Sequence, residues 1–170
     1  MASILARLPY PFASAYNASK AAVASYSDTL RLEVKPLGLN VVTVYMGEVS
    51  TSLMSADNIS FGPESFYADV EVTVKTTSST HGEKSMKPEQ YAHQVLDAIT
   101  GGKNHSVWKG SNAFAVWLMN AVAPRAMFDG MMEGQVGLQD STQISKIFDR
   151  GQRVGKVHGA FAGARDNAYI

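Results

Sequence analysis

The segment spanning residues 16–47 constrains the fold more than any other part of the chain. Apolar residues recurring at spacings of three and four, with many alanines, predict a helix over residues 16–34. Pro36 and Gly38 mark its end. The stretch LNVVTVYMG at 39–47 follows, and its β-branched residues indicate a strand buried on both faces, as in a parallel sheet. Helix, short turn and strand therefore predict the second half of a βαβ unit.

Composition and charge are those of a globular protein and exclude several functional classes. The chain has 170 residues, 45% hydrophobic and 18% charged, which suits one domain with a sizeable core. Lys+Arg and Asp+Glu number 15 each, so the zero net charge gives no electrostatic argument for a nucleic-acid partner. The sequence has no cysteine, which excludes disulfides, thiolate metal sites and cysteine nucleophiles, and its four scattered histidines predict no metal site.

The middle of the chain adds further α/β elements. Residues 48–87 are mostly polar and irregular and predict a long loop, in which VEVTV at 70–74 is the strand-like stretch. Pro88, which a first helical turn tolerates, opens a pattern that predicts a helix over residues 88–100. HSVWKG at 105–110 then predicts a short final strand.

The carboxyl-terminal part of the chain carries an apolar segment at 113–128, interrupted by Pro124 and Arg125. A membrane-spanning helix needs about 20 apolar residues, so this segment cannot cross a bilayer alone. Its apolar side chains fit either the core or a membrane surface, and composition does not separate these two alternatives. Periodicity then weakens, and we expect one domain over residues 1–138 followed by a poorly ordered tail over 139–170.

The stretch YNASK at 16–20 places a tyrosine and a lysine four residues apart. Residues at this spacing share one face of a helix, so the side chains of Tyr16 and Lys20 project together. A nearby ammonium favours the phenolate, which makes a phenol a more effective proton donor near neutral pH. Such pairs also arise by chance on many helices, so the pair alone leaves catalysis and a plain helix surface both open.

Two further features lie on either side of this pair. Ser3 precedes Tyr16 by thirteen residues, at the end of what would be the preceding strand. MGEVST at 46–51 follows the buried strand, at the carboxyl end where open α/β sheets bind ligands. Together with YNASK, these features resemble the short-chain dehydrogenase/reductase family. Its motif is YxxxK, with a serine about thirteen residues upstream and a PGxVxT segment after the next strand, in which Met46 here replaces the proline.

The resemblance implies a catalytic role for three residues. Tyr16 would donate a proton to the substrate carbonyl as hydride arrives, or accept one in the reverse direction. Lys20 would assist Tyr16 and bind the nicotinamide ribose, and Ser3 would polarise and orient the carbonyl. A serine so close to the chain start could instead be a frayed polar residue.

The resemblance also implies an NADP(H) cofactor, held in part by the segment after the buried strand. Tyr16 and Lys20 would contact the cofactor, and Gly47, Val49 and Thr51 would form the turn that holds the nicotinamide carboxamide. Thr51 could instead cap a helix. No residue is expected to bind a metal.

The fold implied by the resemblance is α/β: the carboxyl-terminal part of a Rossmann-type doubly wound parallel sheet, with the amino-terminal half missing. Family members begin with a TGxxxGxG turn that cradles the pyrophosphate, and this sequence has none. Two functions follow. In the first, which the resemblance implies, the chain would be an oxidoreductase that transfers hydride between NADP(H) and a ketone or secondary alcohol. Alternatively, it is a truncated, inactive remnant that acts only through the dimer contacts of the helix bearing YxxxK.

A narrower resemblance is to fungal reductases of 1-acyldihydroxyacetone phosphate, and it extends from Ser3 to Leu138. The stretches that carry it are LPYPFASAYNASK, DTLRLE, VWKG and VWLMNAVAPRAMFD. It implies a small-molecule or lipid carbonyl substrate, either acyl dihydroxyacetone phosphate or a fungal secondary metabolite. It further implies a homo-oligomer in the cytoplasm, with residues 113–128 contacting the endoplasmic reticulum or lipid droplets.

Overall fold

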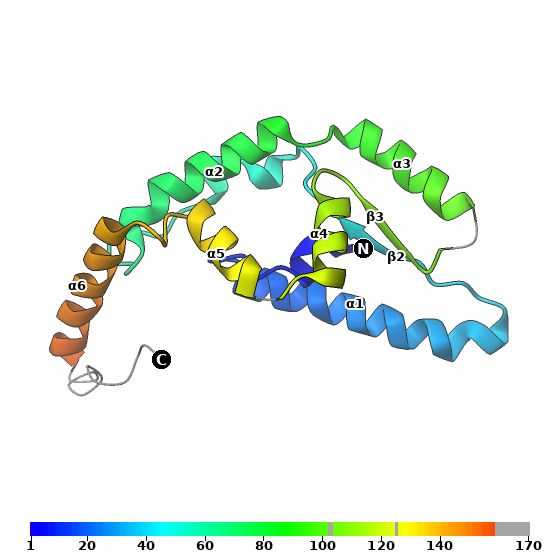
Figure 1. The fold of residues 1–170 in the computed structure, drawn as a ribbon, viewed down its shortest axis with the longest axis horizontal. Helices are drawn as coiled ribbons and strands as arrows, with labels where there is room; N and C mark the ends of the chain where they lie inside the picture. The colour runs from blue at the N-terminus through cyan, green and yellow to red at the C-terminus, as the bar shows by residue number, and fades with distance from the viewer. Residues whose placement is uncertain (102–103, 125, 159–170) are drawn as a thin grey trace.

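The described part of the chain forms a parallel three-stranded sheet with helices on both faces (Figure 1). The structure is a computed structural model that describes residues 1–101, 104–124 and 126–158. The strands are β1 (Ala2–Ser3), β2 (Thr43–Met46) and β3 (Ser106–Lys109), in that spatial order. The parallel sheet predicted from the buried strand and the short final strand is confirmed.

Helix α1 (Ser14–Val34) is the long alanine-rich helix predicted from its periodicity. Ala24 is buried against the sheet beside Ala2 and Tyr45. The small side chain of alanine lets the helix approach the strands closely, because no bulk separates the two backbones. The helix leads into a 3₁₀ turn, Lys35–Leu37, which ends where Gly38 adopts the left-handed conformation at φ 73°.

Helix α3 (Pro88–Thr100) covers the opposite face of the sheet. It confirms the helix predicted over residues 88–100. Its Tyr91 packs in a buried cluster with Val44 and Val107. Neighbouring strand residues point to opposite faces, so Val44 meets α3 while Tyr45 meets α1. This two-sided burial explains the β-branched character of β2 and confirms the doubly wound α/β arrangement.

The region 48–87 departs from the irregular loop predicted for it, and the strand predicted at 70–74 is wrong. The structure has helix α2 (Glu71–Lys84), preceded by a 3₁₀ turn over Ala68–Val70. Val70 and Val74, four residues apart, are both buried, whereas Val72 is 73% exposed. A strand would have placed all three on one face, so burial follows the helical period. Glu71 and Lys75 form an i,i+4 ion pair of 2.6 Å that supports the first turn.

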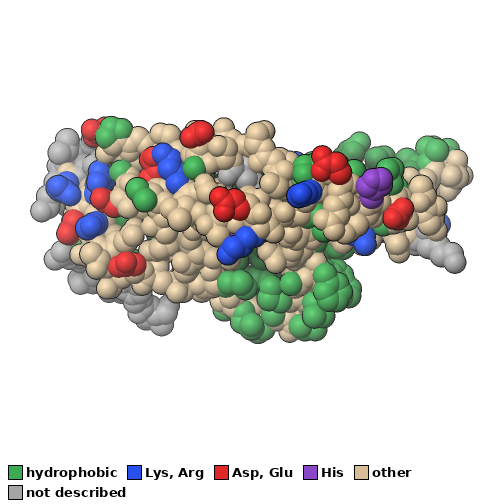
Figure 2. Space-filling view, turned by 90° about the horizontal axis from the view of Figure 1, so that it is seen from above, with side chains coloured by type: hydrophobic (Ala, Val, Ile, Leu, Met, Phe, Trp, Pro, Cys, Tyr) green, Lys and Arg blue, Asp and Glu red, His purple; other side chains and the backbone are tan. Residues whose placement is uncertain are grey.

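The apolar segment 113–128 divides between two helices, α4 (Ala113–Val122) and α5 (Ala126–Gln135). Three of its side chains enter the core with Ile4 and Leu8; these are Ala113, Val116 and Phe128. Other apolar side chains of these helices stay exposed; these are Phe114, Trp117, Leu118, Val122, Met127 and Met131. Figure 2 shows apolar side chains gathered in a bulge of the surface. Among the described residues, every helix is too short or too polar to cross a membrane.

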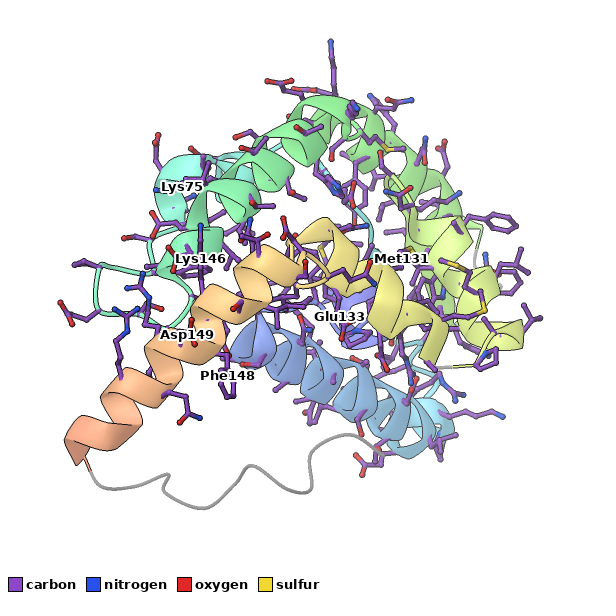
Figure 3. The ribbon with its side chains drawn as sticks, turned by 60° about the vertical axis from the view of Figure 1, so that its left-hand side comes forward. Lys75, Met131, Glu133, Lys146, Phe148 and Asp149 are labelled. Atoms are coloured by element: carbon purple, nitrogen blue, oxygen red, sulfur yellow. The ribbon has the colours of Figure 1, made fainter. Side chains whose placement is uncertain are left out.

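Within the segment from residue 139 onward, for which the sequence predicts a poorly ordered tail, the structure has helix α6 (Ser141–His158), which runs past the start of α2 (Figure 3). Asp140 starts the helix, because its Oδ1 accepts hydrogen bonds from the backbone amides of Thr142 and Gln143 at 2.8 and 3.3 Å. Arg150 then ties the helix to Asp69 through a 2.8 Å ion pair. The rest of the predicted tail lies outside the described residues.

Candidate active site

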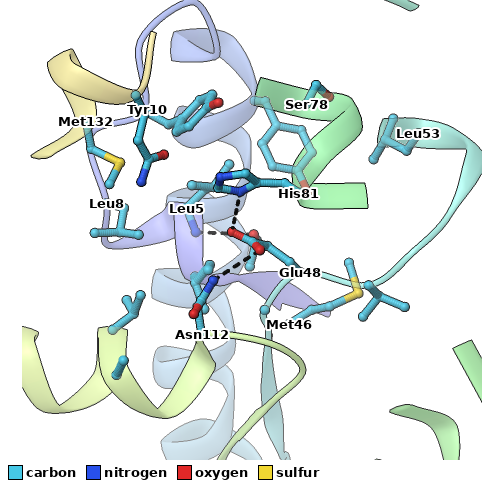
Figure 4. A pocket seen from close by; sticks show the side chains of 18 of the residues that line it. Leu5, Leu8, Tyr10, Met46, Glu48, Leu53, Ser78, His81, Asn112 and Met132 are labelled. Carbon is cyan, nitrogen blue, oxygen red and sulfur yellow. Dashed lines mark hydrogen bonds and ion pairs between the residues drawn. The ribbon is translucent and has the colours of Figure 1, made fainter. Parts of the chain in front are cut away.

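A cavity of about 560 Å³ opens where the carboxyl ends of the strands meet helices α2, α4 and α5 (Figure 4). Its polar lining residues are Ser3, Tyr10, Tyr16, Glu48, Thr51, Ser78, His81, Asn112 and Gln135. The rest of its wall is apolar apart from Gly47; it is built from Ile4, Leu5, Leu8, Met46, Val49, Leu53, Ala115, Val116, Met119, Met131 and Met132. The cavity therefore lies where open α/β sheets bind their ligands.

Two of the three predicted catalytic residues, Ser3 and Tyr16, line this cavity. They come from different elements, the end of β1 and the first turn of α1. Lys20 is one helical turn further along α1, with its Nζ 5.2 Å from the centroid of the Tyr16 ring, and does not line the cavity. The structure thus brings the predicted serine and tyrosine to one cavity and places the lysine behind the tyrosine.

Ser3 is held firmly at the end of β1. Its side chain is buried, and its Oγ accepts a hydrogen bond of 3.2 Å from the backbone amide of Leu5, which starts a 3₁₀ turn over Ile4–Ala6. The alternative that Ser3 is a frayed terminal residue is therefore wrong. A hydroxyl that accepts one hydrogen bond keeps its own proton to donate, so Ser3 can still polarise a carbonyl.

The turn between β2 and the cavity depends on glycine at position 47. Gly47 is buried, and its backbone amide donates a 2.8 Å hydrogen bond to the carbonyl of Lys109. A Cβ at this position would lie 2.2 Å from the carbonyl oxygen of Ser111, a separation that atoms do not tolerate. Glycine is thus required because the loops that follow β2 and β3 touch here.

Val49 and Thr51 follow Gly47 around the rim of the cavity. Val49 is buried and pairs with Met86 in an isolated parallel bridge, which fixes the backbone beside the cavity. Thr51 precedes the short 3₁₀ turn Ser52–Met54, yet its side chain makes no capping hydrogen bond. The three residues predicted to hold the nicotinamide ring thus border the same cavity as Ser3 and Tyr16.

Tyr10 is a cavity residue that the sequence did not single out. Asn17, next to Tyr16, donates from Nδ2 to the carbonyl oxygens of Leu8 at 3.2 Å and Tyr10 at 3.4 Å. These bonds hold the proline-containing loop against the start of α1. Burial, and then the nearby carboxylate of Glu48, raise the pKa of Tyr10, so its phenol stays neutral and can donate a hydrogen bond.

Glu48 is the second cavity residue that sequence reasoning missed as a functional group. Its Oε1 lies 3.0 Å from Nδ1 of His81, and its Oε2 accepts a 3.1 Å hydrogen bond from Nδ2 of Asn112 (Figure 4). A carboxylate only accepts, so Nδ1 of His81 carries the proton of that bond. The three residues come from the loop after β2, helix α2 and the start of α4, so no local pattern could have connected them.

The family model of short chain dehydrogenases matches residues 1–60 of the chain, which contain every predicted site residue. The chain is 30% identical over 141 residues to the short-chain dehydrogenase RED1 of Pyricularia oryzae, covering 77% of this chain and 49% of that protein. It is 34% identical over 121 residues to the short-chain dehydrogenase anuB of Penicillium roqueforti, covering 69% and 42% respectively. The chain therefore spans about half the length of these relatives. No solved structure matches it.

Proposed function

The chain belongs to the short-chain dehydrogenase family. We propose that it forms part of an oxidoreductase that transfers hydride between NADP(H) and a ketone or secondary alcohol. The observation that carries the proposal is that Ser3 and Tyr16 line one cavity, with Lys20 beside the Tyr16 ring. A buried serine and a tyrosine at one cavity, with an ammonium behind the tyrosine, are the groups that carbonyl reduction needs: an orienting hydroxyl, a proton donor and a charge that stabilises the phenolate.

Each residue has a distinct part in the proposed reaction. The hydroxyl of Ser3 donates a hydrogen bond to the substrate carbonyl oxygen and fixes its direction. The hydroxyl of Tyr16 then gives its proton to the same oxygen as the carbon is reduced. Lys20 lies one turn behind, where its ammonium stabilises the phenolate that remains. In the direction of alcohol oxidation, Tyr16 accepts the proton instead.

The nicotinamide end of NADP(H) fits the rim formed by Gly47, Val49 and Thr51, since these residues border the cavity that holds Ser3 and Tyr16. When bound, the cofactor supplies or removes the hydride. The backbone at Val49 and the hydroxyl of Thr51 would hold its carboxamide, and Lys20 its ribose. Binding of the pyrophosphate requires a glycine-rich turn that this sequence does not contain.

The proposed substrate is a ketone or secondary alcohol with a sizeable apolar body, because most of the cavity wall is apolar. Both an acyl dihydroxyacetone phosphate and a fungal secondary metabolite have such a body. We further propose a cytoplasmic enzyme whose α4 contacts the surface of the endoplasmic reticulum or of lipid droplets. The exposed side chains of Phe114, Trp117 and Val122 support this contact.

The alternative function is an inactive partner that acts only through dimer contacts. Helix α1 favours it, because Tyr26 and Leu32 are 68% and 61% exposed on that helix. In a dimer built on α1, these side chains would be covered by the second copy. In the described sheet, β1 also pairs on one side only, so its other edge is open for pairing.

An experiment with a fusion protein, here called the joined protein, distinguishes the two functions. The amino-terminal half of a short-chain dehydrogenase that contains the glycine-rich TGxxxGxG turn is fused ahead of Met1, and NADPH oxidation is followed with a panel of ketones. The proposed function expects turnover that requires Tyr16. If the joined protein binds NADPH yet reduces no ketone, while this chain alone forms stable dimers, the inactive partner is the better description.

A further inference from the structure

The cavity contains one carboxylate in a wall that is otherwise mostly apolar. The Glu48 side chain keeps 23% of its surface exposed, and it lines the cavity beside Leu5, Met46 and Val116. Within the part of the chain that the structure describes, the cavity is lined by no Lys or Arg. The ionisable groups that line the cavity together with Glu48 are His81, Tyr10 and Tyr16, and of these His81 can balance its charge when it is protonated.

Glu48 is also held rigidly. Its backbone exchanges two hydrogen bonds with Ser111, of 3.0 and 3.1 Å, and its side chain is fixed by His81 and Asn112. A carboxylate offers about four acceptor positions, of which these two side chains occupy two. The others remain for a donor that enters the cavity.

The charge of Glu48 has opposite consequences for two classes of substrate. A neutral ketone that carries a hydroxyl group can donate a charge-assisted hydrogen bond to the carboxylate, and such bonds are stronger than neutral ones. A phosphorylated ketone brings negative charge beside another negative charge, in a cavity of low dielectric constant and without a lysine or arginine in its wall.

We propose that Glu48, held by His81 and Asn112, selects the substrate: it accepts a hydrogen bond from a hydroxyl group of a neutral, hydroxylated ketone and rejects phosphorylated ketones. The inference rests on the proposed function, because it names the substrate class of the same cavity. It favours a hydroxylated secondary metabolite over acyl dihydroxyacetone phosphate.

The test measures binding alone, by calorimetry with the 170-residue chain and three probes that share one body. The probes are 2-acetylnaphthalene, 6-acetyl-2-naphthol and 6-acetyl-2-naphthyl phosphate. We expect the naphthol to bind about tenfold tighter than the unsubstituted ketone, the usual effect of one hydrogen bond to a charged group. The phosphate should bind about tenfold weaker than the ketone, or not at all.

Variants connect these preferences to the residue. Glu48→Gln keeps the size of the side chain, removes its charge and replaces one acceptor oxygen by a donor NH2 group, so it should lose most of the preference for the naphthol and bind the phosphate more tightly. Glu64→Gln removes one charge from an exposed loop outside the cavity and should change neither affinity. Thermal unfolding of both variants checks that the fold is retained.

Three results would overturn the inference: equal affinities for the three probes, an unchanged preference in Glu48→Gln, or no binding of any probe. None of these involves hydride transfer, so the inference can fail while the joined protein still reduces ketones. Conversely, a correct preference without turnover in the joined protein would leave the selectivity of Glu48 in place and refute the proposed reaction.

Discussion

The ammonium nitrogen of Lys20 lies 5.2 Å from the centroid of the Tyr16 ring, one turn further along α1. The helix therefore presents the phenol to the cavity and keeps the cation behind it. In this position the lysine can stabilise a phenolate without occupying the space that a substrate needs. The proposed division of roles between the two residues leads directly to a pair of substitutions.

Tyr16→Phe in the joined protein should lower ketone turnover by about 10²–10⁴-fold, the usual cost of removing a positioned proton donor. Its affinity for NADPH should stay nearly unchanged, because only the hydroxyl is lost. Lys20→Ala should lower both turnover and NADPH affinity, because the ammonium has two proposed roles. Steady-state kinetics and fluorescence titration measure the two effects. Near-normal turnover in Tyr16→Phe would refute the catalytic assignment.

The 170-residue chain alone should bind NADPH no more tightly than about 1 mM. The rim at Gly47, Val49 and Thr51 contacts only the nicotinamide end in our proposal, and the sequence has no glycine-rich turn for the pyrophosphate. Calorimetry with the purified chain measures the affinity, with the joined protein as the positive control. Micromolar binding by the chain alone would mean that another nucleotide site exists.

The sequence predicts those elements whose signals are local. Helix α1 follows from its alanine periodicity, and β2 from a run of β-branched residues that only burial on both faces explains. At 70–74 the local pattern predicts a strand, because valines stand at alternate positions. The structure has a helix there, because Val70 and Val74 are buried against the rest of the molecule at helical spacing. Tertiary packing decided the outcome there.

The candidate site shows the same division. Tyr16 and Lys20 are four residues apart and could be linked by helical spacing alone. Glu48 meets His81 and Asn112, which are 33 and 64 residues away, only after the chain has folded. Arg150 of helix α6 likewise meets Asp69, which is 81 residues away, only in the folded chain. Sequence reasoning finds groups related by short periods and misses those assembled by the fold.

Gly47→Ala should destabilise the chain by about 1–3 kcal/mol, the usual cost of forcing extra volume into a packed site. The new methyl group would lie 2.2 Å from the backbone oxygen of Ser111, so the loops after β2 and β3 must separate. Gly101→Ala is the matched control, because its nearest neighbour would be 3.7 Å away, an ordinary contact. Urea denaturation of both variants measures the difference; equal midpoints would show that the close approach is unimportant.

The start of α2 should lose stability as the pH falls. Bonds from Lys75 and then from the amide of Phe61 lower the pKa of the Glu71 carboxyl below its ordinary value of 4.5. A carboxyl whose pKa is depressed by folding stabilises the fold above that ordinary value, and the stabilisation disappears as pH falls through the lowered pKa. Hydrogen exchange at α2 should therefore quicken below about pH 4.5 relative to α1, an effect that Glu71→Gln should reduce. The exposed Glu64→Gln variant should keep the wild-type pH profile.

Replacing Trp117 or Leu118 by glutamate should decide what the exposed face of α4 does. Both side chains are 44% exposed, so a charge there can be solvated and the fold should be retained. If the face contacts membranes, vesicles of neutral phospholipid should sediment the wild-type chain, and each glutamate variant should bind them at least about tenfold less. Tyr26→Glu, which charges an exposed position on α1 instead, is the control and should sediment as the wild type does.

Unchanged sedimentation in the α4 variants, or none in the wild type, would refute the membrane contact. Loss of folding in the α4 variants would instead show that the face is packed inside the protein.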